Sequence, residues 1–435
     1  MTALLGSSQF FAAHRGSGDN WPEHTLTAYR NSLAAGAAAV EISVRRTADG
    51  KLVCHHDADT ARVTGVAGLI AAATYKDLAA RPVNARQWLG QATPLEPIPL
   101  LTDVLSSLPR DCLILIEDKD GSNTRALLDL MDAQPNSKER FLWKQWAPAA
   151  QVTAARARGY RTWGYFTADV VDRLAELAPR HDSLGVPVEQ DDSVVKQFVS
   201  LGKPVIAWEV HTRFQRDRLA SLGVQGLMCA NYPYVSIQRP AALRDSFATG
   251  MRAAGDLPPD PASGWSNQPE LQPGVGSITL NRSGTPRYSM GSLAPTPAAG
   301  YTLSVTLGWV GPPAGAHSRA GVSFALSTDG PYHPRQANPS GSYQVYLEAT
   351  GAVVLAYQAP SWTASEQLAK LDQVAVGLGH DVSVNVHVTG QQLTLTAAGK
   401  SATVSHMNAR GGYLWLWGEE VTNGARFSGI QIVAD

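Results

Sequence analysis

The first 255 residues alternate short apolar runs with segments of helical length, and this alternation constrains the fold more than any other feature. Nine runs have the length of a buried strand: 10–14, 38–44, 51–55, 112–117, 140–143, 161–165, 184–188, 204–209 and 225–229. The connection at 47–50 is too short for a parallel crossover, so residues 51–55 must return antiparallel on the strand before them. The other eight strands, joined by helical segments over about 250 residues, predict a TIM-type (β/α)8 barrel.

The pattern changes after residue 255. Positions 256–435 hold 11 acidic and 8 basic residues, whereas the first 255 positions hold 26 and 28. Apolar and small polar residues alternate with a period of two, as at 301–309 and 382–388, which predicts an all-β antiparallel sandwich. We therefore expect a barrel at 1–252, a Pro/Gly-rich linker at 253–272, and a sandwich at 273–435 that serves binding, attachment or oligomerisation.

Bulk properties exclude several classes of partner. The net charge is −1 without runs of like charge, which argues against nucleic acid. No segment approaches the roughly 18 apolar residues of a membrane span, and the N-terminus lacks signal-peptide features. The expected location is the cytoplasm or a particle, such as a phage virion, that acts outside the cell. Three widely spaced cysteines, Cys54, Cys112 and Cys229, predict buried free thiols.

Two histidines that are distant in the sequence are predicted to meet at one end of the barrel. His14 ends the first strand, and the hairpin returns His56 to a place opposite Ser43 and close to Glu41. Barrel enzymes carry their chemistry at the carboxyl ends of the strands. Two imidazoles and a carboxylate supply a proton acceptor, a proton donor and a cation site, the groups needed to hydrolyse a phosphate ester.

The sequence motifs around these residues are similar to those of the glycerophosphodiester phosphodiesterases, a family of phospholipase-C-like phosphodiesterase barrels. The family pattern runs His-Arg-Gly, Pro-Glu-Asn-Thr, Glu-x-Asp, Thr-x-Asp-Gly-x-x-Val-x-x-His-Asp, Glu-x-Lys and a late strand that carries Trp. The corresponding segments here begin at His14, Pro22, Glu41, Thr47, Glu117 and Trp208. These ordered matches span residues 9 to about 235 and leave the sandwich outside the resemblance.

The resemblance implies metal-dependent hydrolysis of a glycerol-containing phosphodiester. It makes His14 and His56 the general acid/base pair, whose ordinary pKa near neutrality suits proton transfer in both directions. It makes Glu41 and Glu117 ligands of a divalent cation, Mg²⁺ or Ca²⁺, because hard oxygen donors suit these ions.

The resemblance also assigns four supporting residues. Arg15 and Lys119 would hold the phosphate, the first as a planar fork and the second as a point charge. Glu23 would hold the first loop by hydrogen bonding or contact the metal or substrate. Trp208 would form an apolar wall of the pocket, although barrel packing explains it equally well.

Three positions depart from the family pattern. Ser43 stands where the family has Asp, so the cation site loses one negative charge and Ser43 is a weaker ligand. His24 replaces the Asn of Pro-Glu-Asn-Thr, and Asn231 stands where the last strand usually ends in Asp. These changes leave the two histidines intact and leave the identity of the metal open.

The appended sandwich widens the choice of substrate. A polymeric glycerol phosphodiester, such as a teichoic-acid-like cell-wall chain, would benefit from a tethered binding module. The sandwich resembles the concanavalin/laminin-G type, and Trp362, Tyr343 and Tyr346 could stack on carbohydrate; contact with a protein assembly is the other option. The alternatives are a catalytically weakened or inactive barrel that serves as a binding or structural component, for example of a phage tail, and a related phospholipase-type phosphodiesterase.

Overall fold

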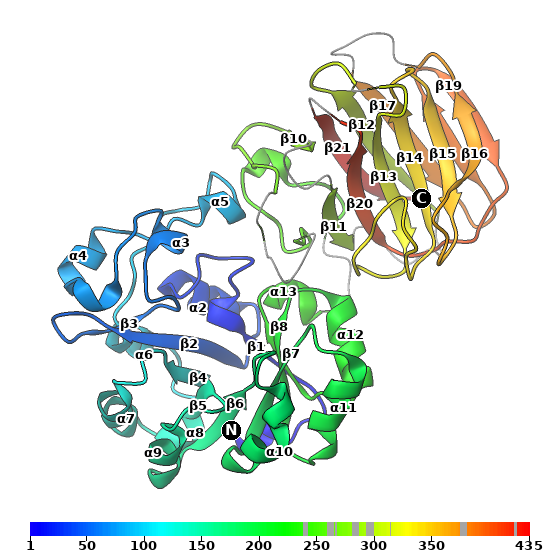
Figure 1. The fold of residues 1–435 in the computed structure, drawn as a ribbon. Helices are drawn as coiled ribbons and strands as arrows, with labels where there is room; N and C mark the ends of the chain where they lie inside the picture. Colours follow the sequence, from blue (N-terminus) through cyan, green and yellow to red (C-terminus); the bar gives the residue numbers. More distant parts are fainter. Residues whose placement is uncertain are drawn as a thin grey trace. The chain divides into compact units, whose positions relative to one another are not determined.

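The computed structural model describes residues 1–237, 242–258, 265, 268–280, 287–292, 300–313, 315–374, 381–421 and 424–435 (Figure 1). It divides into two compact units. The first comprises Met1–Leu89, Thr93–His211 and Gln215–Ser236, and the second comprises Gly90–Ala92, Thr212–Phe214 and Ile237–Asp435. Part of the expected linker, 259–264 and 266–267, lies outside the described residues. The division into 1–252, 253–272 and 273–435 stays a prediction.

Eight parallel strands of the described residues close into a barrel in the first unit. They are β1 (Phe10–Ala13), β2 (Ala39–Arg46), β4 (Leu113–Asp118), β5 (Phe141–Trp146), β6 (Arg161–Tyr165), β7 (Ser183–Pro187), β8 (Val205–Val210) and β9 (Gly226–Cys229). The barrel closes because β1 pairs in parallel with both β2 and β9. The predicted TIM-type barrel is confirmed, with every strand close to its expected range.

The short strand β3 (Leu52–Cys54) returns antiparallel on β2, as the short connection predicted. Val44 pairs with Cys54, and Arg46 pairs with Leu52. The backbone N–H of His55 then donates to the carbonyl oxygen of Ser43 over 3.0 Å. The hairpin therefore leads the chain back to the carboxyl end of β2.

Helical segments connect the strands around the barrel (Figure 1). The α-helices are α1 (Thr2–Leu5), α2 (Leu26–Ala34), α3 (Ala61–Thr64), α4 (Tyr75–Ala79), α5 (Arg86–Leu89), α6 (Leu101–Ser107), α7 (Thr124–Asp132), α8 (Ser137–Arg140), α9 (Val152–Ala157), α10 (Leu174–Leu177), α11 (Asp192–Ser200), α12 (Arg213–Ser221) and α13 (Tyr232–Val235). The side chain of Thr25 caps α2 by accepting from the backbone N–H of Ala28. Among the described helices, none has the length and apolar character that crossing a bilayer requires.

Apolar side chains from several strands pack in the interior of the barrel. Leu115, Leu142, Trp163, Ile206 and Met228 belong to one buried cluster. The cysteines Cys54, Cys112 and Cys229, all in the described part of the chain, are free and buried, as predicted. The packed interior leaves the strand ends as the place for chemistry.

The described part of the second unit holds two six-stranded antiparallel sheets. The strand order of one sheet is β10 (Ser277–Leu280), β21 (Ala425–Ala434), β12 (Tyr301–Trp309), β17 (Val382–Val388), β18 (Leu393–Ala397) and β19 (Lys400–Val404). The strand order of the other sheet is β11 (Arg287–Ser292), β20 (Tyr413–Glu419), β13 (Arg319–Leu326), β14 (Ser342–Glu348), β15 (Val353–Gln358) and β16 (Glu366–Leu371). Leu303 and Val384 of the first sheet share one apolar core with Val322 and Leu355 of the second. The predicted sandwich is confirmed.

Two of the three proposed sugar-stacking residues are unsuited to that role. Tyr343 is fully buried, and its hydroxyl donates to the carbonyl oxygen of His406 over 2.9 Å. Tyr346 is buried against Trp417, with ring centroids 5.7 Å apart. Trp362 is exposed. The two tyrosines were attributed to a surface because alternation does not show which face of a strand is covered.

Candidate active site

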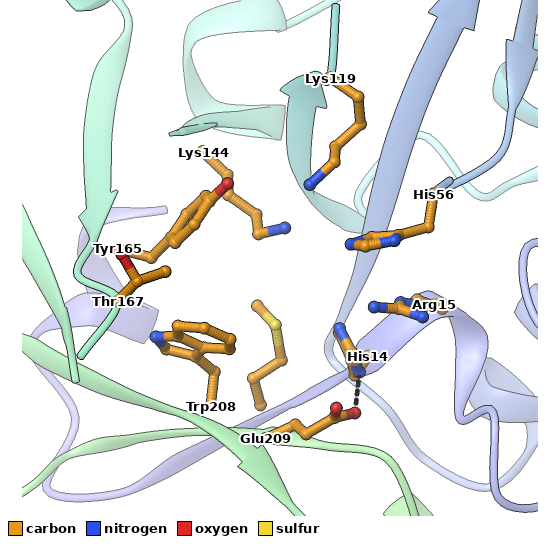
Figure 2. A pocket seen from close by; sticks show the side chains of 10 residues that line it. His14, Arg15, His56, Lys119, Lys144, Tyr165, Thr167, Trp208 and Glu209 are labelled. Atoms are coloured by element: carbon orange, nitrogen blue, oxygen red, sulfur yellow. Dashed lines mark ion pairs between the residues drawn. The ribbon is translucent and has the colours of Figure 1, made fainter. Parts of the chain in front are cut away.

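A cavity of about 270 Å³ opens at the carboxyl ends of the barrel strands. The described residues that line it are His14, Arg15, His56, Lys119, Lys144, Tyr165, Thr167, Trp208, Glu209 and Met228. Figure 2 shows His14, Arg15 and His56 along one side of this space and Lys144, Tyr165 and Trp208 along the other, with Lys119 between the two groups. Five sequence-predicted site residues, among them both histidines, thus share one cavity.

His14 follows β1 in a tight turn that the backbone conformation fixes. The turn is a single 3-10 segment, His14–Gly16, in which Gly16 has a φ of +77°. A Cβ at Gly16 would lie 2.8 Å from the Cβ of Ala28, so only glycine fits. The imidazole Nδ1 lies 2.7 Å from Oε2 of Glu209, which orients the ring and leaves Nε2 for a ligand (Figure 2).

His56 lies just beyond β3 and has a different carboxylate partner. Its Nδ1 donates to Oδ1 of Asp57 over 2.7 Å, which leaves Nε2 as the acceptor of the neutral ring. Burial, followed by the nearby positive charge of Arg15, lowers the pKa of His56 to about 4. At neutral pH the ring is therefore uncharged and can accept a proton.

Glu41 and Glu117, the expected metal ligands, are joined by a lysine. Nζ of Lys144 donates to Oε1 of Glu41 over 2.8 Å and to Oε2 of Glu117 over 2.5 Å. All three side chains are buried. They come from β2, β4 and β5, which are neighbours in the sheet.

The charges of this trio stabilise one another. Burial alone would raise the pKa values of both carboxyl groups, but the surrounding positive charges, with the ammonium of Lys144 foremost, together outweigh it and lower them. Burial alone would lower the pKa of Lys144, but Glu117 and Glu41 outweigh it and raise that pKa. At neutral pH the cluster therefore consists of two carboxylates and one ammonium.

The remaining oxygen positions of the two carboxylates also accept hydrogen bonds. Ser43 Oγ donates to Oε1 of Glu41 over 3.0 Å, and the backbone N–H of Arg15 donates to Oε2 over 3.0 Å. Lys119 Nζ and the hydroxyl of Tyr165 both donate to Oε1 of Glu117, over 3.2 and 2.7 Å. Every oxygen of the pair thus accepts at least one hydrogen bond.

These residues do not fit a divalent cation. Such an ion needs several oxygen donors free to approach within about 2.0–2.6 Å. Lys144 lies between the two carboxylates, and Ser43 supplies a donating hydroxyl instead of a third carboxylate. Within the described residues, no group of three or more His, Cys, Asp or Glu side chains is placed to hold a metal ion.

Glu23 holds the first loop through arginines. Its carboxylate accepts from Nη1 of Arg15 over 3.3 Å and from Nη1 and Nη2 of Arg62 over 2.9 and 2.6 Å. Burial would raise the pKa of Glu23, but these two cations outweigh it and lower that pKa. The arrangement fixes Arg15 beside the cavity.

The structure also shows the surroundings of Trp208 and of the two other residues that depart from the family pattern, His24 and Asn231. Trp208 lines the cavity and contacts Tyr165 edge-on, with centroids 5.4 Å apart. His24 is buried, with Nδ1 2.7 Å from the hydroxyl of Tyr29. Oδ1 of Asn231 accepts from Nδ2 of Asn20 over 3.0 Å.

Sequence reasoning missed several lining residues. Lys144 follows the predicted strand 140–143, whereas β5 continues to Trp146. A lysine between tryptophans at the end of a barrel strand was the available signal. Tyr165 and Glu209 were included only as the last residues of the predicted strands 161–165 and 204–209. Their roles depend on partners from other strands.

Comparison with known proteins gives a consistent result. Residues 14–231 match the model of the glycerophosphoryl diester phosphodiesterase family. The uncharacterized protein YqiK of Bacillus subtilis is 37% identical over 228 residues, which cover 49% of this chain and 92% of YqiK. A probable glycerophosphodiester phosphodiesterase 1 of Mycobacterium tuberculosis is 32% identical over 182 residues, which cover 40% of this chain and 63% of that protein.

Solved structures are similar to about half of the chain. The Oleispira antarctica phosphodiesterase in complex with the product sn-glycerol-3-phosphate is 20% identical, with a TM-score of 0.45, over 52% of this chain and 95% of that one.

Proposed function

This chain belongs to the glycerophosphoryl diester phosphodiesterase family of phosphoric diester hydrolases, and we propose that its barrel hydrolyses a phosphodiester bearing a glycerol-like group. The observation that carries the proposal is the pair of histidines that line one cavity with three cationic side chains. That combination can exchange protons and hold an anion in the same place. The small volume suits a single glycerophosphate unit, since ligand pockets are commonly about 300–1,000 Å³.

The two histidines take different parts in the proposed reaction. His56 is the general base, because its neutral ring has a free Nε2 at neutral pH. His14 is the general acid, held by Glu209 through Nδ1 so that Nε2 faces the leaving oxygen. A carboxylate in this position orients the ring.

The reaction balances with these two groups. The nucleophile oxygen loses its proton to His56 and forms a bond to phosphorus, while the bond to the leaving oxygen breaks and that oxygen takes a proton from His14. Arg15 and Lys119 hold the phosphoryl oxygens and offset their growing negative charge. Water or a neighbouring glycerol hydroxyl serves as the nucleophile, and phosphorus NMR separates these routes because the second forms a cyclic phosphate.

Purified full-length protein tests the proposal. Glycerophosphocholine, glycerophosphoethanolamine and glycerophosphoglycerol are each incubated with it, and sn-glycerol 3-phosphate is measured with a coupled dehydrogenase. We expect its release from at least one of them. Release of phosphocholine would instead support a phospholipase-C-type reaction, and absence of any product would support an inactive barrel used for binding or assembly.

We also propose that polymeric glycerol phosphodiesters, such as teichoic-acid-like chains, are substrates. The attached sandwich supports this, because a tethered module raises the local concentration of a long substrate. The small cavity supports cleavage one unit at a time. A poly(glycerol phosphate) of defined length is expected to release monomeric product, and failure to shorten the chain while glycerophosphocholine is hydrolysed would exclude it.

The lowered pKa of His56 predicts how activity depends on pH. A base must be unprotonated, so a ring with a pKa of about 4 stays competent until the pH falls to about 4, rather than failing near its ordinary value of 6.5. We expect the His56 ring to titrate near 4 by NMR of its Cε1–H signal in the free protein. Titration near 6.5 would contradict the role given to burial and Arg15.

A further inference from the structure

A lysine ammonium occupies the position between the two buried carboxylates of the barrel. Nζ of Lys144 donates to Glu41 over 2.8 Å and to Glu117 over 2.5 Å, and the lysine also lines the cavity. Figure 2 shows it directed into the space that His14 and His56 face. One positive charge therefore contacts both carboxylates and borders the substrate cavity.

The surrounding groups are matched to an ammonium ion. Ser43 donates its hydroxyl to Glu41, and Tyr165 donates its hydroxyl to Glu117. Two carboxylates offset one internal ammonium and the adjacent Lys119, which is 3.2 Å from Glu117. An aspartate at position 43 would add a negative charge beside this cluster, whereas serine adds a donor that Glu41 accepts.

We infer that Lys144 takes the place of a divalent cation in this barrel, so that the hydrolysis proposed above proceeds without a metal ion. The inference rests on the proposed function. Lys144 keeps its proton throughout: its charge stabilises the phosphoryl oxygens while His56 accepts the proton of the nucleophile and His14 protonates the leaving oxygen. Together with Arg15 and Lys119 it gives the cavity three fixed positive charges.

The first test uses the full-length protein with a chelator. After dialysis against EDTA, the metal content is measured by mass spectrometry and the turnover of the preferred glycerophosphodiester is measured with and without added Mg²⁺ or Ca²⁺. We expect no stoichiometric metal and the same turnover under all conditions. Turnover that disappears in EDTA and returns with either ion would overturn the inference.

Replacing the lysine provides the second test. Lys144→Met, which keeps the unbranched side chain up to Cε and removes the charge, is expected to lower kcat by about 10²–10³-fold, the usual loss when one preorganised stabilising donor is removed. Lys196→Met, at an exposed lysine of α11, is the control and should leave kcat unchanged. Full kcat in Lys144→Met would overturn the inference.

The third test needs neither substrate nor activity. Mn²⁺ binding is followed by electron paramagnetic resonance in the native protein and in the double variant Ser43→Asp/Lys144→Gln, which restores three carboxylates. We expect binding by the double variant alone. Binding of one Mn²⁺ per native chain that is lost in Glu41→Gln would overturn the inference. This test remains decisive even if the protein hydrolyses no phosphodiester and the proposed function fails. If the double variant does not fold, the native protein alone decides.

Discussion

Replacing either His14 or His56 by alanine is expected to lower kcat/KM for a glycerophosphodiester by about 10²–10⁴-fold, the usual contribution of one general acid or base. Each ring lines the cavity and is held through Nδ1 by its own carboxylate, Glu209 or Asp57. The double variant should lose little more than either single variant, because the two transfers belong to one reaction. His387→Ala, at a half-buried histidine of the sandwich, is the matched control.

An activated substrate separates the two roles. A p-nitrophenyl phosphodiester has a leaving group that departs without protonation. Loss of the general acid therefore lowers kcat/KM only slightly, whereas loss of the general base lowers it as much as with a glycerophosphodiester. We expect His14→Ala to regain most of its activity on this substrate and His56→Ala to stay impaired. The opposite result would reverse the assignment, and unchanged activity of both variants on both substrates would remove the histidines from the mechanism.

The fold could be predicted because it depends on patterns within single segments. Each barrel strand is a short apolar run, and the connection at 47–50 is long enough only for a hairpin, so strand count and closure followed. The sandwich followed in the same way from period-two alternation. The burial of Tyr343 could not be predicted, because burial depends on which elements cover a strand.

The cavity was only partly predictable for the same reason. His14, His56 and Trp208 lie in local sequence motifs that resemble those of a family. The role of Lys144, in contrast, depends on two carboxylates on other strands. Ser43 was read as a weakened metal ligand because its sequence position suggested a ligand. Its hydroxyl donates to Glu41 instead. The direction of a hydrogen bond depends on the partner, which the sequence alone does not identify.

Replacing Glu41 by alanine is expected to destabilise the barrel by about 3–5 kcal/mol, the usual loss when one partner of a buried ion pair is removed. Glu41 is fully buried and accepts from Lys144, Ser43 and the backbone N–H of Arg15, so its removal leaves three donors without this acceptor. Urea unfolding of the barrel, followed by tryptophan fluorescence, measures the change. Ser43→Ala is the control and should cost only about 1 kcal/mol, since one hydrogen bond is lost.

The same experiment distinguishes an ion pair from a metal site. If Lys144 is the partner of Glu41, the loss in Glu41→Ala is the same in EDTA and in Mg²⁺, because no ion contributes to the stability of the native protein. The double variant Glu41→Met/Lys144→Met should then be more stable than the sum of the single changes predicts, since removing both charges leaves neither one buried alone. Strict additivity, or a loss seen only with Mg²⁺ present, would mean that the two side chains do not stabilise each other as their 2.8 Å contact requires.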